Sequence, residues 1–143
     1  MNPWIADTGA FVAALDSRDL HHKRVAAAFR SDTRRTLWTT VPVLTESLHL
    51  LGDLADAPGK LLELLRRTRT KIEDVANWET LEEAVALMQK YADIPMDFAD
   101  ASLVLLAGRI GVHDILTTDE SGFRVFRIQR RKAFHLVLDD FPG

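Results

Sequence analysis

The chain has 143 residues, of which 47% are hydrophobic and 27% charged, with a formal net charge of -3. This length suits one domain with its own core, and the composition is typical of globular proteins rather than disordered, collagen-like or coiled-coil chains. Because the chain has no cysteine, disulfides, thiolate metal sites and a cysteine nucleophile are excluded. No apolar stretch approaches the ~20 residues of a membrane span, and residues 1–7 lack the pattern of a signal peptide. We therefore expect a single cytoplasmic domain over residues 1–143, with no membrane partner.

Apolar residues recur at strand or helix spacing along the whole chain. Pro42 favours the first turn of a helix, and Pro95 ends another because the residue before a proline avoids helical geometry. The predicted strands are 4–6, 36–40, 71–75, 115–118 and 134–138. The predicted helices are 11–15, 20–30, 42–51, 56–65 (with Leu61, Leu62, Leu64 and Leu65 facing inward), 77–94 and 97–107. Short strands separated by helices predict a three-layer α/β/α sandwich with a mainly parallel central sheet.

Acidic residues stand where such a sheet binds ligands, at the carboxyl ends of its strands. Asp7 and Asp119 each follow a predicted strand, and Glu46 lies about one turn into the helix after the strand around Trp38. Asp97 and Asp100 share the first turn of a later helix, and their spacing of three makes them face the same way. We expect these carboxylates to meet at one edge of the sheet.

Each acid also has a local interpretation. Asp7 and Asp97 suit helix N-caps, Glu46 suits a solvated helix face, and Asp119 suits a turn. If these acids form a cluster, their repulsion must be relieved, because two carboxylates 4 Å apart repel by roughly 4 kcal/mol at an effective dielectric of about 20. Raised pKa values, a basic side chain or a divalent cation can relieve this repulsion, and no Lys or Arg adjoins Asp7, Glu46, Asp100 or Asp119 in the sequence. Oxygen-only ligands favour Mg²⁺ or Mn²⁺, which indicates metal-assisted phosphodiester hydrolysis.

Four short motifs carry a family resemblance: Asp7-Thr8-Gly9, Leu44-Thr45-Glu46, Asp97-Phe98-Ala99-Asp100-Ala101 and Thr117-Thr118-Asp119. In order and spacing, over essentially the whole chain, they resemble the PIN-domain nucleases, and in particular the VapC-like ribonuclease toxins of type II toxin-antitoxin modules. The resemblance implies that Asp7, Glu46, Asp100 and Asp119 are catalytic, metal-binding residues. It makes Asp97 an additional acid, and Thr8 and Thr117 hydroxyls that orient metal, water or a carboxylate. Gly9 departs from the family, in which many relatives have serine or another small residue.

The same resemblance implies a biological role. It implies an endoribonuclease that depends on Mg²⁺ or Mn²⁺, forms a homodimer and is inhibited by a small antitoxin protein. The antitoxins of this type commonly place a basic or aromatic segment over the acidic pocket, which suits a cluster of negative charge.

The segment 124–132 carries five basic residues and no acid. Arg124 and Arg127 are the predicted contacts to an RNA substrate, and a solvated basic face is the alternative. Two other functions stay open: a catalytically inactive PIN-like module that binds RNA or protein, and a phosphoacceptor signalling domain. The sequence disfavours the second, because Thr8 rather than another acid follows Asp7 and no lysine follows Leu138.

Overall fold

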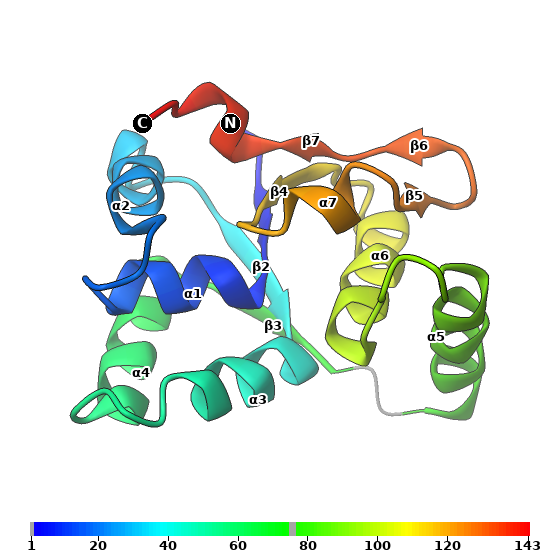
Figure 1. Ribbon diagram of the computed structural model, residues 1–143, viewed down its shortest axis with the longest axis horizontal. Coiled ribbons are helices and arrows are strands. Elements are labelled where there is room, and N and C mark those ends of the chain that lie inside the picture. Colours follow the sequence, from blue (N-terminus) through cyan, green and yellow to red (C-terminus); the bar gives the residue numbers. More distant parts are fainter. Residues whose placement is uncertain (1, 75–76) are drawn as a thin grey trace.

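The computed structural model describes residues 2–74 and 77–143, and a parallel five-stranded sheet crosses its centre (Figure 1). The strand order is β3-β2-β1-β4-β7, and every neighbouring pair is parallel. The central strand pairs on both sides, since Ile5 lies opposite Trp38 and Ile115. The strands are β1 (Trp4–Ala6), β2 (Leu37–Thr40), β3 (Lys71–Glu73), β4 (Asp114–Leu116) and β7 (His135–Leu136).

Helices cover both faces of this sheet. The helices are α1 (Thr8–Leu15), α2 (His22–Ser31), α3 (Val41–Leu50), α4 (Ala57–Arg67), α5 (Trp78–Lys90), α6 (Phe98–Ile110) and α7 (Glu120–Phe123), and a 3-10 turn follows at Val137–Asp140. Trp4 and Leu37 pack in a core cluster with α1 and α2. Ile5 and Ile115 pack in a second cluster, to which α6 contributes most. The three-layer α/β/α architecture is confirmed.

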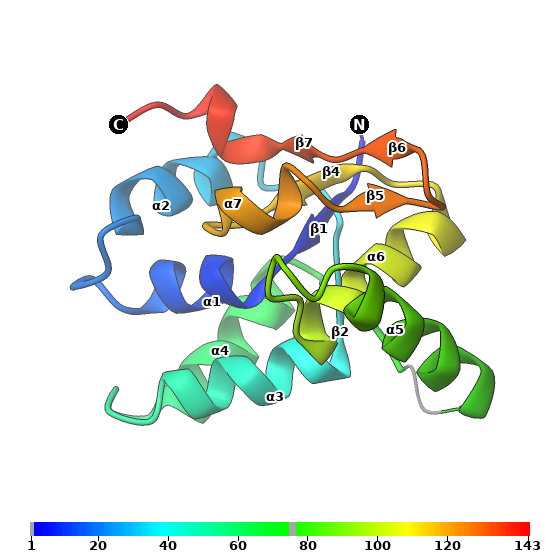
Figure 2. The same cartoon turned by 45° about the vertical axis from the view of Figure 1, so that its right-hand side comes forward.

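A small hairpin formed by β5 (Arg127–Ile128) and β6 (Lys132–Ala133) leads into β7. Its first strand packs against α6, and Figure 2 shows the hairpin beside the C-terminal end of that helix. This hairpin and the short helix α7 are absent from the elements expected from the sequence. Both lie in a segment whose charged residues hide any hydrophobic period.

Four expectations need correction or lie outside the described residues. Leu62 is 48% exposed rather than inward-facing, because α4 turns that side away from the core. The strand expected at 134–138 covers only His135–Leu136, since the next residues form the 3-10 turn. The strand expected at 115–118 ends at Leu116, which leaves Thr117 in a loop. The strand expected at 71–75 ends at Glu73, and Val75 lies outside the described residues.

Within the described parts of the chain, no helix is long and apolar enough to cross a membrane.

Candidate active site

Asp7 connects the central strand β1 to helix α1 and is only 4% exposed. Its Oδ1 accepts a hydrogen bond from Thr8 N at 2.7 Å, and its Oδ2 accepts one from Thr117 Oγ1 at 2.7 Å. Asp7 is the N-cap of α1, as its local interpretation predicts. No Lys or Arg of the described chain forms a salt bridge with it. Burial therefore raises the pKa of Asp7 to about 7, although both hydrogen bonds oppose this.

Thr117 connects Asp7 to the loop that carries Asp119. The Thr117 hydroxyl donates to Asp7 Oδ2 and accepts from Asp119 N at 3.0 Å. Asp119 caps α7 in turn, because its Oδ1 accepts from Gly122 N at 3.1 Å. A Cβ at Gly122 would lie 2.6 Å from Asp119 Oδ2, so this tight turn requires glycine. One buried hydroxyl thus fixes two of the predicted catalytic acids relative to each other.

Asp97 and Asp100 form a reciprocal capping box at the start of α6. Asp100 N donates to Asp97 Oδ1 at 2.7 Å, and Asp97 N donates to Asp100 Oδ2 at 3.2 Å. Asp100 is only 8% exposed, and burial raises its pKa to about 8. The neighbouring negative charges of Asp7, Asp97 and Asp119 act in the same direction. Asp97 therefore caps the helix, as its local interpretation predicts, and its charge acts on the buried acid beside it; its place in a catalytic site stays a prediction.

Glu46 lies on α3, is partly buried, and contacts the carboxyl of Asp97. Burial raises its pKa, and contact with the Asp97 carboxyl adds to the shift. Glu46 and Asp97 also line one surface cavity of about 590 Å³, together with the apolar residues Val41, Pro42 and Phe98. Glu46 is therefore partly covered rather than fully solvated, and its role in a site stays a prediction.

The acids share one edge of the sheet, but they are not gathered into a ready-made ligand set. Among the described residues, no group of three or more Asp, Glu, His or Cys side chains is arranged to hold a metal ion. The carboxylates do not converge because Asp97, Asp100 and Asp119 each use one carboxylate oxygen to accept a hydrogen bond from a backbone N–H at the start of a helix.

Oxygen donors at this edge nevertheless suit a hard cation. Asp7 and Asp100 are buried without a cationic side chain to balance them, and the buried Thr8 Oγ1 has no hydrogen-bond partner in the described chain. A buried polar atom without a partner is unfavourable and calls for a ligand or water. The donor chemistry of these residues therefore suits a hard divalent cation.

A family model of the PIN domain matches residues 5–128. The chain belongs to the PIN domain family. Ribonuclease VapC26 of Mycobacterium tuberculosis is 28% identical to it over 125 residues, which are 86% of this chain and 91% of that relative. The crystal structure of Mycobacterium tuberculosis VapC20, a sarcin-ricin loop cleaving toxin, superimposes with a TM-score of 0.73 at 18% identity. That match covers 85% of this chain and 95% of VapC20 and shows that the two share a fold.

The resemblance to VapC-like PIN nucleases is thus confirmed, and so is the PIN-like architecture. The structure also explains the unusual Gly9 of this PIN domain. A Cβ at position 9 would lie 2.1 Å from Thr118 Oγ1, so a larger residue requires the Thr118 side chain to move.

The two arginines predicted to contact RNA are engaged within this PIN domain. Arg124 Nη2 donates to Asp139 Oδ1 at 2.7 Å, which orients its guanidinium along the surface. Arg127 Nη1 donates to three successive backbone carbonyls, those of Arg124, Val125 and Phe126, at 2.8, 3.0 and 3.1 Å. Their role toward RNA stays a prediction.

Sequence reasoning missed the apolar surface beside the acids. A second cavity, of about 450 Å³, shares Val41, Pro42 and Phe98 with the cavity of Glu46 and continues to Trp78 and Leu81. The sequence does contain a pattern that indicates this surface: the apolar residues of α5 are spaced three, four and three apart, which places them on one face of the helix. They are Trp78, Leu81, Val85 and Met88.

Proposed function

We propose that this PIN domain is an endoribonuclease that uses Mg²⁺ or Mn²⁺ to hydrolyse phosphodiester bonds in RNA. The observation that carries the proposal is the pair of buried, uncompensated carboxylates of Asp7 and Asp100 at the carboxyl edge of the sheet. The relationship to a protein named a ribonuclease, over most of both chains, supports the substrate class.

In this proposal Asp7, Glu46, Asp100 and Asp119 hold the cation, and Asp97 is auxiliary. A bound divalent cation supplies Lewis-acid chemistry, in that it lowers the pKa of water and neutralises charge on phosphoryl oxygens. Thr117 holds Asp7 and the Asp119 loop in place through its two hydrogen bonds. The buried Thr8 hydroxyl lies near the carboxyl of Glu46, whose pKa it lowers, and offers an oxygen to a water or ligand there.

Proton balance follows from the raised pKa values. At neutral pH in the metal-free protein, Asp100, with a pKa of about 8, is mostly protonated, and Asp7, with a pKa of about 7, is protonated in about half of the molecules. A cation must displace these protons, because only the ionised carboxylates bind it well. Metal affinity and cleavage are therefore expected to rise between pH 6 and pH 8.

We further propose that Arg124 and Arg127 contact RNA phosphates next to the loop of Asp119. Arg124 is 48% exposed, and it lies one helical turn after Asp119. A contact of this kind makes RNA affinity fall with increasing salt.

The proposed biological role is that of a toxin bound by a small antitoxin protein, and its proposed state is a homodimer. The dimer surface is the seam of Trp78, Leu81, Val85 and Met88 on α5, of which Trp78 is 79% exposed and Val85 42%. Apolar residues at this spacing pair helices in the manner of a coiled coil.

The test is cleavage of a mixed RNA pool with Mg²⁺ or Mn²⁺, with chelator, and with Asp7→Asn. We expect cleavage only by the wild-type protein with metal, whereas the exposed Asp93→Asn variant retains it. RNA binding without cleavage by the wild-type protein at any metal concentration would favour the inactive binding module instead.

A further inference from the structure

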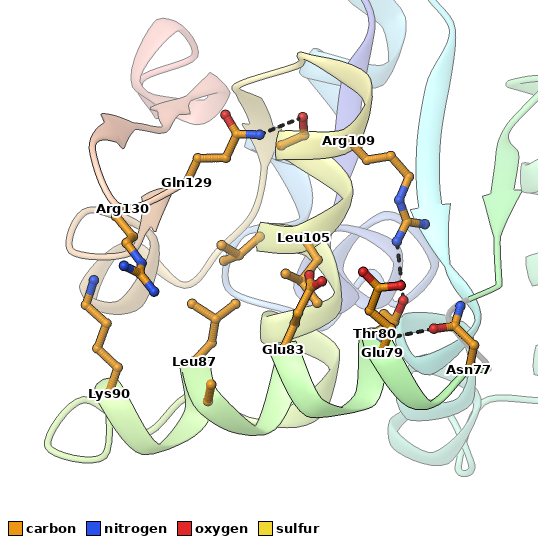
Figure 3. A pocket seen from close by; sticks show the side chains of 13 residues that line it. Asn77, Glu79, Thr80, Glu83, Leu87, Lys90, Leu105, Arg109, Gln129 and Arg130 are labelled. Carbon is orange, nitrogen blue, oxygen red and sulfur yellow. Dashed lines mark hydrogen bonds between the residues drawn. The ribbon is translucent and has the colours of Figure 1, made fainter.

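A separate cavity of about 680 Å³ lies between α5, α6 and the tip of the β5–β6 hairpin (Figure 3). Of the described residues that line it, none is an acid of the candidate active site. It opens on a side of α5 different from the exposed seam that begins at Trp78, and the buried Thr80 is among the residues that line it. The cavity therefore stays accessible when the seam is covered.

Two cations gather at one end of this cavity. Figure 3 shows the Lys90 ammonium and the Arg130 guanidinium at the same end, below the hairpin tip. No salt bridge or side-chain hydrogen bond within the described chain involves either group, and the Lys90 ammonium lies over the Tyr91 ring at 5.2 Å from its centre, a contact that leaves its charge unneutralised. Two like charges without a carboxylate between them form a site for an anion.

The backbone that presents Arg130 is strained. Gln129 and Arg130 have φ values of 50° and 70°, the left-handed region that the two central residues of a tight hairpin turn adopt. Glycine and asparagine suit these positions, whereas glutamine and arginine occupy them at a conformational cost. Gln129 Nε2 donates to Gly108 O at 3.4 Å, which ties the turn to α6. The strained turn fixes the side of the hairpin on which Arg130 lies, over the cavity.

An acceptor and an apolar floor complete the cavity. The Glu83 carboxylate lies away from the two cations, and Leu87 and Leu105 line the space between (Figure 3). Seven residues separate Glu83 from Lys90 on the same helix, a rise of about 10 Å, which is roughly the length of one nucleotide. A ligand that fits has an anionic group, a flat apolar body and hydrogen-bond donors at its far end.

We propose that this cavity binds a guanine nucleotide, either free or as part of an RNA strand. Lys90 and Arg130 bind its phosphate, and the base lies against Leu87 and Leu105. Glu83 accepts from the guanine N1–H and amino group, because a carboxylate only accepts and this edge of guanine offers two adjacent donors. Adenine and uracil lack that pair of donors, so Glu83 sets the base preference.

The experiment is titration of the full-length protein with 5′-GMP in the presence of chelator, followed by calorimetry and by amide chemical shifts. Chelator removes metal-dependent binding at the acidic site, and the Asp7→Asn variant, measured in parallel, must bind equally well. We expect GMP to bind more tightly than AMP, guanosine or inorganic phosphate, with shifts on α5 and the hairpin. Lys90→Ala and Arg130→Ala should each weaken binding about ten-fold, whereas Lys60→Ala on α4 should not.

Glu83→Gln should remove the preference for GMP over AMP and leave AMP binding unchanged. An oligoribonucleotide with one internal guanosine identifies the source of the ligand: binding that depends on Lys90 indicates an RNA strand, and exclusion of the oligonucleotide indicates a free nucleotide. The proposal is overturned if millimolar GMP does not bind, if binding is unchanged by Lys90→Ala with Arg130→Ala, or if the shifts centre on Asp7. None of these outcomes depends on RNA cleavage, so the nuclease proposal stands or fails separately.

Discussion

The uncompensated charge of Asp7 makes a quantitative prediction for the stability of the metal-free protein. The folded chain holds this carboxyl with a pKa of about 7, whereas the unfolded chain releases its proton near 3.8. Between these pH values the folded state binds more protons than the unfolded state, so the free energy of unfolding falls as pH rises and levels off above pH 7. At about 1.4 kcal/mol for each pH unit, Asp7 alone lowers it by up to about 4 kcal/mol. Asp100, with its pKa of about 8, acts in the same direction.

Asp7→Asn removes this dependence because the amide does not ionise. Asn retains the acceptor for Thr8 N, but it deprives the Thr117 hydroxyl of its acceptor, at a cost of about 1 kcal/mol. In chelator at pH 8 we therefore expect Asp7→Asn to be more stable than the wild-type protein by up to about 3 kcal/mol. At pH 4 the variant should be equal or slightly less stable.

The assay is urea unfolding of both proteins at half-unit steps from pH 4 to pH 8 in chelator. The difference between the two curves is the informative quantity, because Asp139, whose pKa is lowered by Arg124, gives both proteins the opposite slope. Asp93→Asn serves as an exposed control and should follow the wild-type curve. An Asp7→Asn protein that is less stable than wild type at every pH would show that the Asp7 charge is well compensated, which contradicts our reasoning. Added Mg²⁺ or Mn²⁺ at pH 8 should stabilise only the wild-type protein.

Substitutions at three further positions test the candidate site and the proposed dimer surface. Thr117→Val keeps the side-chain shape but removes the hydrogen-bond partner of the Asp7 carboxylate and of the Asp119 backbone N–H. We therefore expect the free energy of unfolding in urea to fall by about 1–3 kcal/mol and RNA cleavage to be slower. Unchanged values in both assays would mean that the Thr117 hydrogen bonds are dispensable. Asp97→Ala should lower the free energy of unfolding by about 1 kcal/mol, because it removes the N-cap of α6, whereas Asp97→Asn should retain this cap. Equal melting temperatures for the two variants would count against the capping role of Asp97. Leu81→Lys places a charge in the proposed dimer surface, so sedimentation velocity should show a shift from dimer to monomer. A dimer of unchanged affinity would exclude the α5 seam as the dimer surface.

The positions of the acids could be predicted from sequence because they depend on local order along the chain. A strand followed at once by a helix start places Asp7 at the sheet edge whatever the rest of the fold does. The conformation of Gln129 and Arg130 could not be predicted in this way, because neither residue type favours a left-handed turn and only packing against α6 holds them there. The exposure of Leu62 was equally hidden, since four leucines in one helix do not say which of them the core accepts.

The choice between helix cap and catalytic acid, which the sequence leaves open, is not an exclusive one in the structure. Asp7, Asp97 and Asp119 are the N-caps of α1, α6 and α7, and each gives a carboxylate oxygen to a backbone N–H at the start of its helix. A helix N-terminus needs an acceptor and favours a negative charge, so three helices that begin at one sheet edge bring three carboxylates there for local reasons. The three carboxylates repel one another as a result, and a bound cation removes this repulsion. Asn satisfies the same N–H groups without the charge, whereas Ala removes both the cap and the charge. Only the Asn variants therefore separate a loss of metal binding from a loss of fold.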